Sequence, residues 1–478
     1  MTEIGLSATL PIVRVCMKVK MADFSLSVFI QIIIVFSHYR EIIYKEFIRD
    51  LSMTYRGFFL KKLFGIICLC TIVMASNIFA EETKGISGDI FGKESGYFHP
   101  FISLSESYND NIYNTKDKEE DFITVISPGL WLALPGTKES ISVKEVSGNI
   151  PGGLINTRFK AETFNRYQAY ALYSPQFEIF SNNDDENSTS HLAEGGLQYN
   201  LKGGLSFDIV DQYLKSHDSR GEGVSTSLDE YENNLVDGMI SYELSPKIMV
   251  RAGGSTYNVH YTENRNSYKD RQDMGLSGYL FYAIMSKTSI YAGYDHIDVD
   301  YDDDTSENLS DSNLNRYFTG VKWDITAKSK GNIKVGYLTR EFDKDTENDF
   351  DGFMTEVSLD HNFTSSTGIS CRGAKSNQES DIAGSSYIDS TMLGLGYNQK
   401  ITTKIMASIE LRWENLDYNN ISRTDDIYMI SPKIQYKFTD WLTSDLVYSY
   451  KTRDAESDTT TNYDYENNTY MVKITAAI

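Results

Sequence analysis

K-I-M-A-S-I-E-L-R-W-E, residues 404–414, decides the fold class of this chain. Its apolar side chains stand at every second position, from Ile405 to Trp413, while Glu410, Arg412 and Glu414 lie on the opposite face. Period two is typical of a β-strand, because successive side chains point to opposite faces. Residues 316–325 and 428–438 repeat the pattern. A soluble β-sandwich would also alternate, but a strand with lipid on one side and water on the other best accommodates repeated charge on the second face.

The composition agrees with strands and turns. The chain has 33 Tyr, 24 Phe and 33 Gly but only 8 Pro in 478 residues, and aromatic residues favour strands over helices. Its formal net charge is -22, which repels phosphate backbones, so we expect no nucleic-acid partner.

The N-terminal region predicts export. Residues 53–80 combine the basic Arg56, Lys61 and Lys62 with an apolar core at 63–74 and end at Ala80. This order is typical of a secretory signal peptide, with cleavage after Ala80. We interpret residues 1–52 as an extension from a wrongly assigned start; the alternative is a true N-terminal membrane anchor, for which the apolar run at 24–36 is short.

After cleavage, the remaining chain is expected to form a barrel and to contain one cysteine. Cleavage removes the other three cysteines and leaves Cys371, which can form no internal disulfide and supplies no metal cluster. After residue 81 no apolar run reaches eighteen residues, so only strands could cross a membrane. We expect a periplasmic lead-in at 81–96 and a barrel over 97–478.

Short and long connections alternate along the chain. Short links are expected at 244–247, 286–288, 363–368 and 438–441; long acidic loops are expected at 109–121, 181–191, 216–232, 302–315, 343–351, 375–389 and 452–467. The sequence therefore predicts one all-β, transmembrane, antiparallel up-and-down β-barrel of about 18 strands, wide enough for an aqueous channel. Sixteen strands stay open as an alternative, because residues 136–163 could form an inner turn, an inserted plug or another hairpin. An even number places both termini in the periplasm.

The C-terminus predicts recognition by the barrel assembly machinery. Alternation continues to the last residue and resembles the terminal insertion signal of outer-membrane proteins, although Ile478 stands where an aromatic residue is typical. The residues of this signal are Tyr470, Val472, Ile474, Ala476 and Ile478.

Two short motifs near the start of the predicted barrel resemble the opening of the putative beta-barrel porin 2 family. The first is E-x-Y-x-D-N-I-Y, with Glu106, Tyr108, Asp110 and Asn111; the second is S-P-G-L, with Ser127, Pro128, Gly129 and Leu130. The resemblance implies an outer-membrane barrel, often associated with exopolysaccharide or exosortase systems, without established catalytic residues. Read physically, Asp110 and Asn111 leave the first strand, and Pro128 enters the second with Gly129 able to bend it.

No enzyme chemistry is expected. The histidines are scattered, no Gly-x-Ser-x-Gly stands near them, and no paired His or Cys spacing indicates a metal site. The acidic runs at 301–304 and 343–351 lack the pattern of a calcium loop. We therefore expect no catalytic residue, cofactor or metal.

The charged second faces predict the lumen wall of a porin-like channel passing small polar solutes or a polysaccharide chain. The alternative is a non-conducting structural or adhesive barrel that acts through its acidic loops. Expected partners are outer-membrane lipid and lipopolysaccharide, the assembly machinery and polysaccharide export components. The lumen candidates are Lys322, Asp324, Glu410, Arg412, Glu414, Lys433, Lys437, Asp445 and Lys451.

Overall fold

The computed structural model describes residues 97–134, 146–160, 166–220, 227–303, 309–326, 328–344, 348–380, 382, 384–458 and 462–477. The chain divides into two units, residues 1–80 and 81–478, and every described residue belongs to the second. The predicted N-terminal extension, signal peptide and lead-in lie outside the described residues, as does Ile478.

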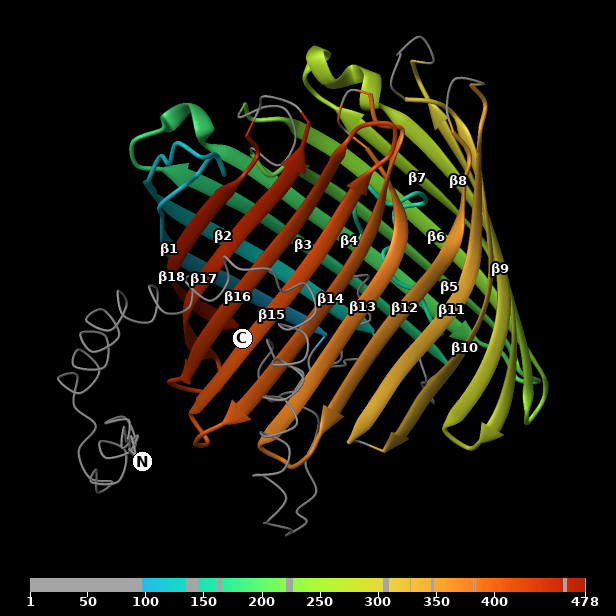
Figure 1. The fold of residues 1–478 in the computed structure, drawn as a ribbon. Coiled ribbons are helices and arrows are strands. Elements are labelled where there is room, and N and C mark those ends of the chain that lie inside the picture. The colour runs from blue at the N-terminus through green and yellow to red at the C-terminus, as the bar shows by residue number, and fades with distance from the viewer. Residues whose placement is uncertain are drawn as a thin grey trace, which may run out of the picture. The chain divides into compact units, whose positions relative to one another are not determined.

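Eighteen antiparallel strands form one closed barrel (Figure 1). Each strand pairs with its neighbours along the chain, and β1 pairs with β18 from Phe101↔Ala477 to Asn109↔Thr469. This confirms the predicted barrel and the higher of the two strand numbers. The strands are β1 (Phe98–Asn109), β2 (Asp121–Leu134), β3 (Tyr167–Phe180), β4 (Ser188–Asn200), β5 (Leu205–His217), β6 (Glu230–Ser245), β7 (Ile248–Tyr261), β8 (Arg271–Met285), β9 (Thr288–Tyr301), β10 (Ser312–Thr326), β11 (Ser329–Phe342), β12 (Phe350–Asn362), β13 (Thr367–Glu379), β14 (Tyr387–Lys400), β15 (Ile405–Tyr418), β16 (Arg423–Lys437), β17 (Leu442–Ser457) and β18 (Tyr465–Ala477).

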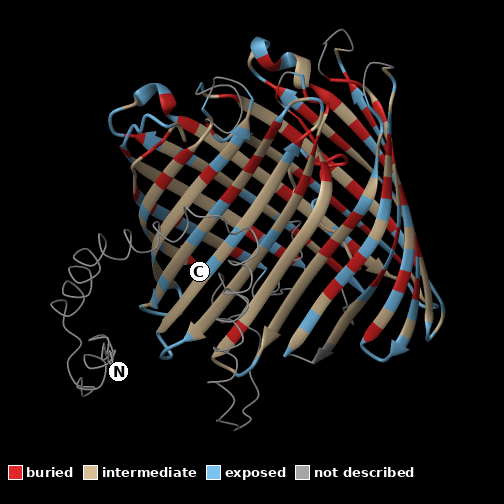
Figure 2. Ribbon diagram, viewed as in Figure 1, coloured by how far each residue is buried: buried red, intermediate tan, exposed pale blue. Residues whose placement is uncertain are grey.

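The outer face of the barrel is apolar. Alternation places Ile102 and Leu104 of β1 and Leu276 and Leu280 of β8 on this face, each about half exposed, and Phe353 of β12 is 74% exposed. Figure 2 shows exposed and buried residues alternating along such strands. An apolar band of this extent is far larger than a soluble monomer exposes, and contact with lipid accounts for it. The described residues contain no helix long and apolar enough to cross a membrane.

The two ends of the barrel differ, as predicted. All four expected short links join strands at one end, here called the turn end; the long loops lie at the opposite loop end. The loops are shorter than predicted because the polar flanks of several remain paired as strand. β13, for example, continues to Glu379, with Asn377 opposite Asp389. Backbone pairing is independent of side-chain polarity, and beyond the apolar band both strand faces can be polar.

Two details of the loop end were not predicted. The connection between β7 and β8 is a long loop that carries the short 3-10 helix η2 (Asn264–Lys269), and residues 419–422 form a short turn between β15 and β16. Another short 3-10 helix, η1 (Asp184–Glu186), lies in the loop between β3 and β4.

The first loop confirms one prediction and corrects another. Asp110 and Asn111 leave β1 as expected, and the Asn111 side chain donates hydrogen bonds to the carbonyl groups of Thr115 at 2.7 Å and Glu466 at 2.9 Å. Pro128 does not begin the next strand. β2 starts at Asp121, whose carboxylate accepts backbone hydrogen bonds from the β3–β4 loop, and Pro128 lies in the middle of the strand.

Candidate channel lumen

Residues 146–160, here called the inserted segment, lie inside the barrel. They belong to the connection between β2 and β3, which meet at the turn end, yet their tip contacts the loop end. There, the Gly148 carbonyl accepts a hydrogen bond from Arg271 at 2.6 Å, and the Asn149 carbonyl accepts one from the Glu379 amide at 2.8 Å. Of the three readings of residues 136–163, the described part, residues 146–160, agrees with the inserted plug (teal trace in Figure 1), and the rest of the range lies outside the described residues.

The tip depends on two adjacent glycines. Gly152 and Gly153 both have φ of +77°, a region that other residues rarely adopt. A Cβ on Gly153 would lie 2.6 Å from the Tyr257 ring, so the tip also needs the missing side chain for space. The Gly152 amide donates to Asp273 Oδ2 at 2.7 Å, which joins the tip to β8.

After the tip, the inserted segment continues through residues 154–160, here called the returning limb. Charged groups hold this limb against two parts of the barrel wall. Arg158 forms ion pairs with Asp208 of β5 and Asp237 of β6, and its Nε lies 2.6 Å from Asp237 Oδ1. On the other side, the Thr157 hydroxyl donates to Glu356 Oε2 of β12 at 2.9 Å. Since both aspartates and Glu356 are buried, these contacts fix the limb far more firmly than exposed pairs would.

Aromatic packing covers the wall between β8 and β10. The Phe159 ring lies 5.7 Å from the Tyr291 ring and 6.3 Å from the Phe281 ring, measured between centroids. The ammonium of Lys322 lies 4.9 Å from the Phe159 centroid. Lys322 thus faces the lumen, as its alternation predicts, but beneath the inserted segment.

The opposite part of the wall is open. A cavity of about 740 Å³ lies between the inserted segment and the barrel wall; residues of β6 to β17 line it, most of them on β12 to β15. Its lining includes Glu410, Arg412 and Glu414 of β15 and Lys433 of β16, all predicted lumen residues. Small side chains such as Ser370, Gly394, Gly396, Ser408 and Ser431 leave room between these charges. We call this space the conduit.

The conduit wall is hydrated and of mixed charge. Arg412 pairs with Glu414 at 2.8 Å, whereas Glu410 and Lys433 have no ion-pair partner among the described residues. Glu410 and Arg412 are exposed although they point inward, which agrees with the largely intermediate colouring of β13 to β16 in Figure 2. Such a wall suits polar solutes, because each charge keeps contact with water.

The remaining predicted lumen residues lie away from the centre of the conduit. Lys437 ends β16 at the turn end, where its ammonium lies 2.9 Å from Asp440. Asp445 of β17 accepts a hydrogen bond from Gln435 at 2.9 Å. By alternation, Asp324 shares the lumen face of β10 with Lys322, and Lys451 shares that of β17 with Asp445.

Several lumen residues were missed from the sequence. Arg316 and Arg372 line the cavity, and Asp208, Asp237 and Glu356 anchor the inserted segment. Alternation along their strands could have placed all five on the inner face. Which of them would meet the inserted segment depends on contacts between residues far apart in the chain, for which one sequence carries no signal.

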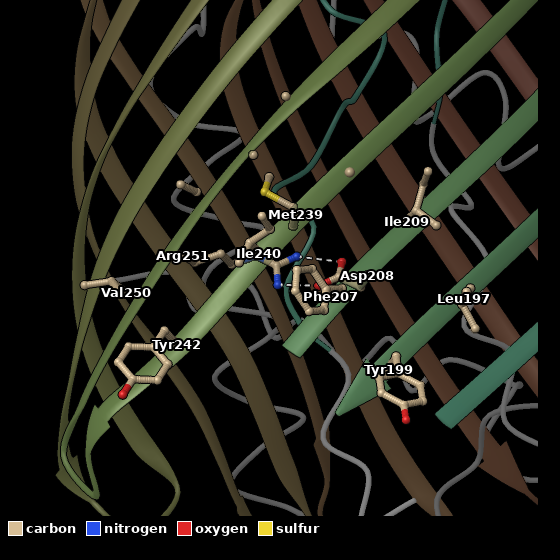
Figure 3. A pocket seen from close by; sticks show the side chains of 14 residues that line it. Leu197, Tyr199, Phe207, Asp208, Ile209, Met239, Ile240, Tyr242, Val250 and Arg251 are labelled. Atoms are coloured by element: carbon tan, nitrogen blue, oxygen red, sulfur yellow. Dashed lines mark hydrogen bonds and ion pairs between the residues drawn. The ribbon is translucent and has the colours of Figure 1, made fainter. Parts of the chain in front are cut away.

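A second hollow, of about 660 Å³, opens on the outer face of β4 to β7 (Figure 3). Gly238, Ala252 and Gly254 form its floor, and Leu197, Phe207 and Ile209 are among its apolar walls. The buried pair between Arg251 and Asp208, with Nη1 to Oδ2 at 2.8 Å, points to the lumen side of the same strands. The hollow therefore belongs to the lipid-facing surface and is separate from the conduit.

The motif residues Glu106 and Tyr108 connect β1 to its two neighbours, β2 and β18. Glu106 and Tyr108 point outward: Thr124 donates to Glu106 at 2.6 Å, and the Tyr108 ring lies 5.2 Å from Phe122 and 6.4 Å from Tyr470. Tyr470, Val472 and Ile474 of the predicted insertion signal also face outward and are about half exposed, and Ala476 pairs with Ile102.

Asp110 closes the loop end of the same junction. Its carboxylate accepts the Asn468 backbone N–H at 2.7 Å and the Lys118 ammonium at 3.0 Å. Partial burial alone would raise the pKa of Asp110, but these hydrogen bonds and the lysine charge outweigh it and lower the pKa.

Comparison with known families decides the assignment. The family model described as Putative beta-barrel porin 2 matches residues 148–478. The chain belongs to this family. The match begins after Glu106 to Leu130, so the predicted family is confirmed by the later strands, and the two opening motifs stay predictions. No curated protein is similar enough to count as a relative.

Comparison with solved structures finds outer-membrane proteins at very low identity and low TM-score. The outer membrane protein OpdK of Pseudomonas aeruginosa is 7% identical, with a TM-score of 0.40 over 80% of this chain and 99% of that chain. OccK2 (OpdF) of the same organism, in complex with glucuronate, is 7% identical with a TM-score of 0.41, over 83% of this chain and 100% of that one. A ferric enterobactin receptor (PfeA) mutant, also from P. aeruginosa, is 7% identical with a TM-score of 0.39 and 81% coverage of both chains.

Among the described residues, no group of three or more His, Cys, Asp or Glu side chains is arranged to hold a metal ion. The matching family is described as one of β-barrel porins. The absence of catalysis stays an expectation from the sequence.

Proposed function

We propose that this protein is a porin-like channel of the outer membrane and that polar solutes pass through the conduit. The observation that carries the proposal is the division of the lumen into a wall covered by the inserted segment and a wall that carries the exposed charges of Glu410 and Arg412 and the partly exposed Lys433. A lumen with only a structural role would not require charged side chains in contact with water along one side.

The proposal includes the route to the membrane. A signal peptide ending at Ala80 would direct export, and the apolar band and the terminal strand would then allow insertion by the assembly machinery. Lipid and lipopolysaccharide would surround the barrel. An acidic loop end facing lipopolysaccharide could be bridged by divalent cations.

The mixed charge of the conduit suits an uncharged or zwitterionic polar solute, including a segment of a sugar chain. Sugar hydroxyl groups can both donate to Glu410 and accept from Arg412, so neither charge sign would exclude them. An association with polysaccharide export components is part of the proposal and follows from the family resemblance.

Two single-cysteine variants on β15, compared with each other, test the conduit directly. Glu410 faces the lumen and Leu411, its neighbour, faces outward. In a C371S background, E410C channels reconstituted in a planar bilayer should lose conductance when a bulky, charged, water-soluble thiol reagent is added. L411C channels should not respond.

Equal loss in both variants would mean that the reagent acts elsewhere. No loss in E410C, with the cysteine shown by mass spectrometry to be modified, would place ion flow outside the conduit. Silence of both variants before reagent addition, with the barrel folded, would favour the structural or adhesive alternative.

A further inference from the structure

The hollow on the outer face of β4 to β7 is open to the membrane. Leu197, Ile209 and Ile240 along its walls are each about half exposed. The small residues of its floor, such as Gly238 and Ala252, leave the space between these side chains unfilled. An acyl chain of a membrane lipid would therefore contact more side chains in the hollow than on the convex wall beside it, and each contact adds dispersion energy.

The two ends of the hollow differ in chemistry. Tyr199 of β4 and Tyr242 of β6 lie nearest the turn end, and Figure 3 shows both hydroxyl groups pointing toward that end. Tyrosine is typical of the boundary between membrane and water. Toward the loop end, Asp211 is the next outward residue of β5 after Ile209, and its carboxylate accepts a hydrogen bond from Asn234 at 2.8 Å. A negatively charged ligand group is therefore accommodated only at the turn end.

Three cations lie at the turn end of the hollow. The guanidinium carbon of Arg166 lies 5.5 Å from the centre of the Tyr199 ring. Lys202 is exposed in the turn between β4 and β5, and Lys247 is exposed in the turn between β6 and β7. The first of these turns lies beside the end of β6, because the Gly204 carbonyl accepts a backbone hydrogen bond from that strand at 3.0 Å. Positive charge thus borders the apolar hollow at the membrane boundary.

Among the described residues, no acidic side chain pairs with these three cations. Arg166, Lys202 and Lys247 form no ion pair there. Glu243 is close in the chain, but by alternation it faces the lumen, where its carboxylate lies 3.3 Å from the Lys160 ammonium. The outer face of this end is therefore positive, although the chain as a whole is strongly acidic.

We propose that the hollow and Arg166, Lys202 and Lys247 form a binding site for an anionic phospholipid of the periplasmic leaflet. One acyl chain lies in the hollow, and the phosphate group accepts hydrogen bonds from the cations. The turn end faces the periplasm in the proposed orientation, because both ends of the barrel chain lie there. Lipopolysaccharide belongs to the opposite leaflet, so phospholipid is the ligand that the position selects. The inference rests on the proposed outer-membrane location but not on ion flow through the conduit.

Lipid titration monitored by native mass spectrometry tests the site. The full sequence is expressed in a Gram-negative host, and the folded protein is purified in detergent and freed of lipid. It is then titrated with phosphatidylglycerol or with phosphatidylethanolamine carrying the same acyl chains. Wild type should bind one phosphatidylglycerol molecule more tightly than phosphatidylethanolamine. Because binding is read from mass, a channel that passes no ions leaves this test intact, so failure of the proposed function and failure of the site are separate results.

Variants separate the cations from the hollow. R166Q/K202Q/K247Q should weaken phosphatidylglycerol binding about a hundredfold, the combined effect of three basic side chains near anionic lipid. Its matched control, K330Q/K400Q/K404Q, removes three exposed lysines at the β10–β11 and β14–β15 turns of the same end and should bind as the wild type does. A252L fills the floor of the hollow and should weaken the binding of both lipids. A heat-modifiability gel shows that each barrel is folded.

Equal affinity of the wild type for the two lipids would overturn the site. An equal loss in the two triple variants, or phosphatidylglycerol binding that A252L leaves unchanged, would also overturn it. So would a wild-type dimer that A252L dissociates, because a second copy of the chain would then occupy the hollow. If R166Q/K202Q/K247Q fails to fold, the comparison of the two lipids in the wild type and in A252L decides the matter.

Discussion

Single residues fix the inserted segment in the lumen, and Gly153 is the most constrained of them. Its φ of +77° and the Tyr257 ring 2.6 Å from its missing Cβ leave no room for a larger residue. The sequence shows a glycine pair after Pro151, which predicts a turn. It does not show that the turn lies against β7, because that contact joins residues about a hundred positions apart.

G153V should therefore loosen the tip while the barrel stays closed. The strained backbone and the clash together disfavour the docked tip by about 2 kcal/mol. Limited proteolysis should cut the variant within residues 146–160 faster than the wild type. G148A is the matched control, since nothing lies within 4 Å of its added Cβ. Equal cleavage in G153V and G148A would contradict the account of the tip.

The lowered pKa of Asp110 predicts that the stability of the folded protein depends on pH. Its pKa is lower in the folded protein than in the unfolded chain, so its contribution is complete above the unfolded pKa of about 4 and is lost as the pH falls through the folded pKa. In detergent, wild type should melt above D110N at pH 6, and the difference should shrink below about pH 4. A difference that persists unchanged to the lowest pH would show that the Asp110 charge does not hold this junction.

At the scale of elements, strands were predictable and the inserted segment was not. The alternation of residues 404–414 appears directly as β15, because one face must meet lipid whatever the rest of the chain does. Loop bounds failed where polar residues such as Asn377 and Asp389 stay paired. The path of residues 146–160 depends on ion pairs between distant residues, which alternation cannot reveal.

Arg158 should be the strongest single anchor of the inserted segment. R158A leaves the buried Asp237 without its partner and should destabilise the docked segment by about 3–5 kcal/mol, whereas R158A/D237N should recover much of that loss. The protection of the segment from proteolysis and from amide hydrogen exchange measures both the loss in R158A and the recovery in the double variant. Additive effects of the two substitutions would mean that the pair is not coupled as the structure shows.

Removal of the inserted segment should widen the lumen. Replacing residues 146–160 with a short glycine and serine linker exposes the aromatic wall around Tyr291 and should raise single-channel conductance severalfold. The barrel should persist, since strand pairing is complete without the segment. A conductance equal to that of the wild type would show that the narrowest part of the path lies elsewhere.

For the whole molecule, the barrel could be predicted from the sequence, whereas the arrangement inside its lumen depends on tertiary contacts. The strands have two faces of opposite polarity, and closure of the eighteen strands leaves no exposed sheet edge. The conduit exists because the inserted segment occupies one side of the lumen and leaves a cavity whose lining lies mostly on the strip from β12 to β17. The predicted lumen charges on β15 and on β16 at Lys433 lie on that strip, while Lys322 lies beneath the segment.

Single-channel recording of the wild-type protein in a planar bilayer tests the central claim most directly, with a heat-modifiability gel to show that the barrel is folded. The account predicts stable, stepwise conductance from the folded barrel, smaller than that of the variant without the inserted segment. A folded barrel that passes no ions, in a preparation where that variant does conduct, would contradict the claim that the conduit is an open path.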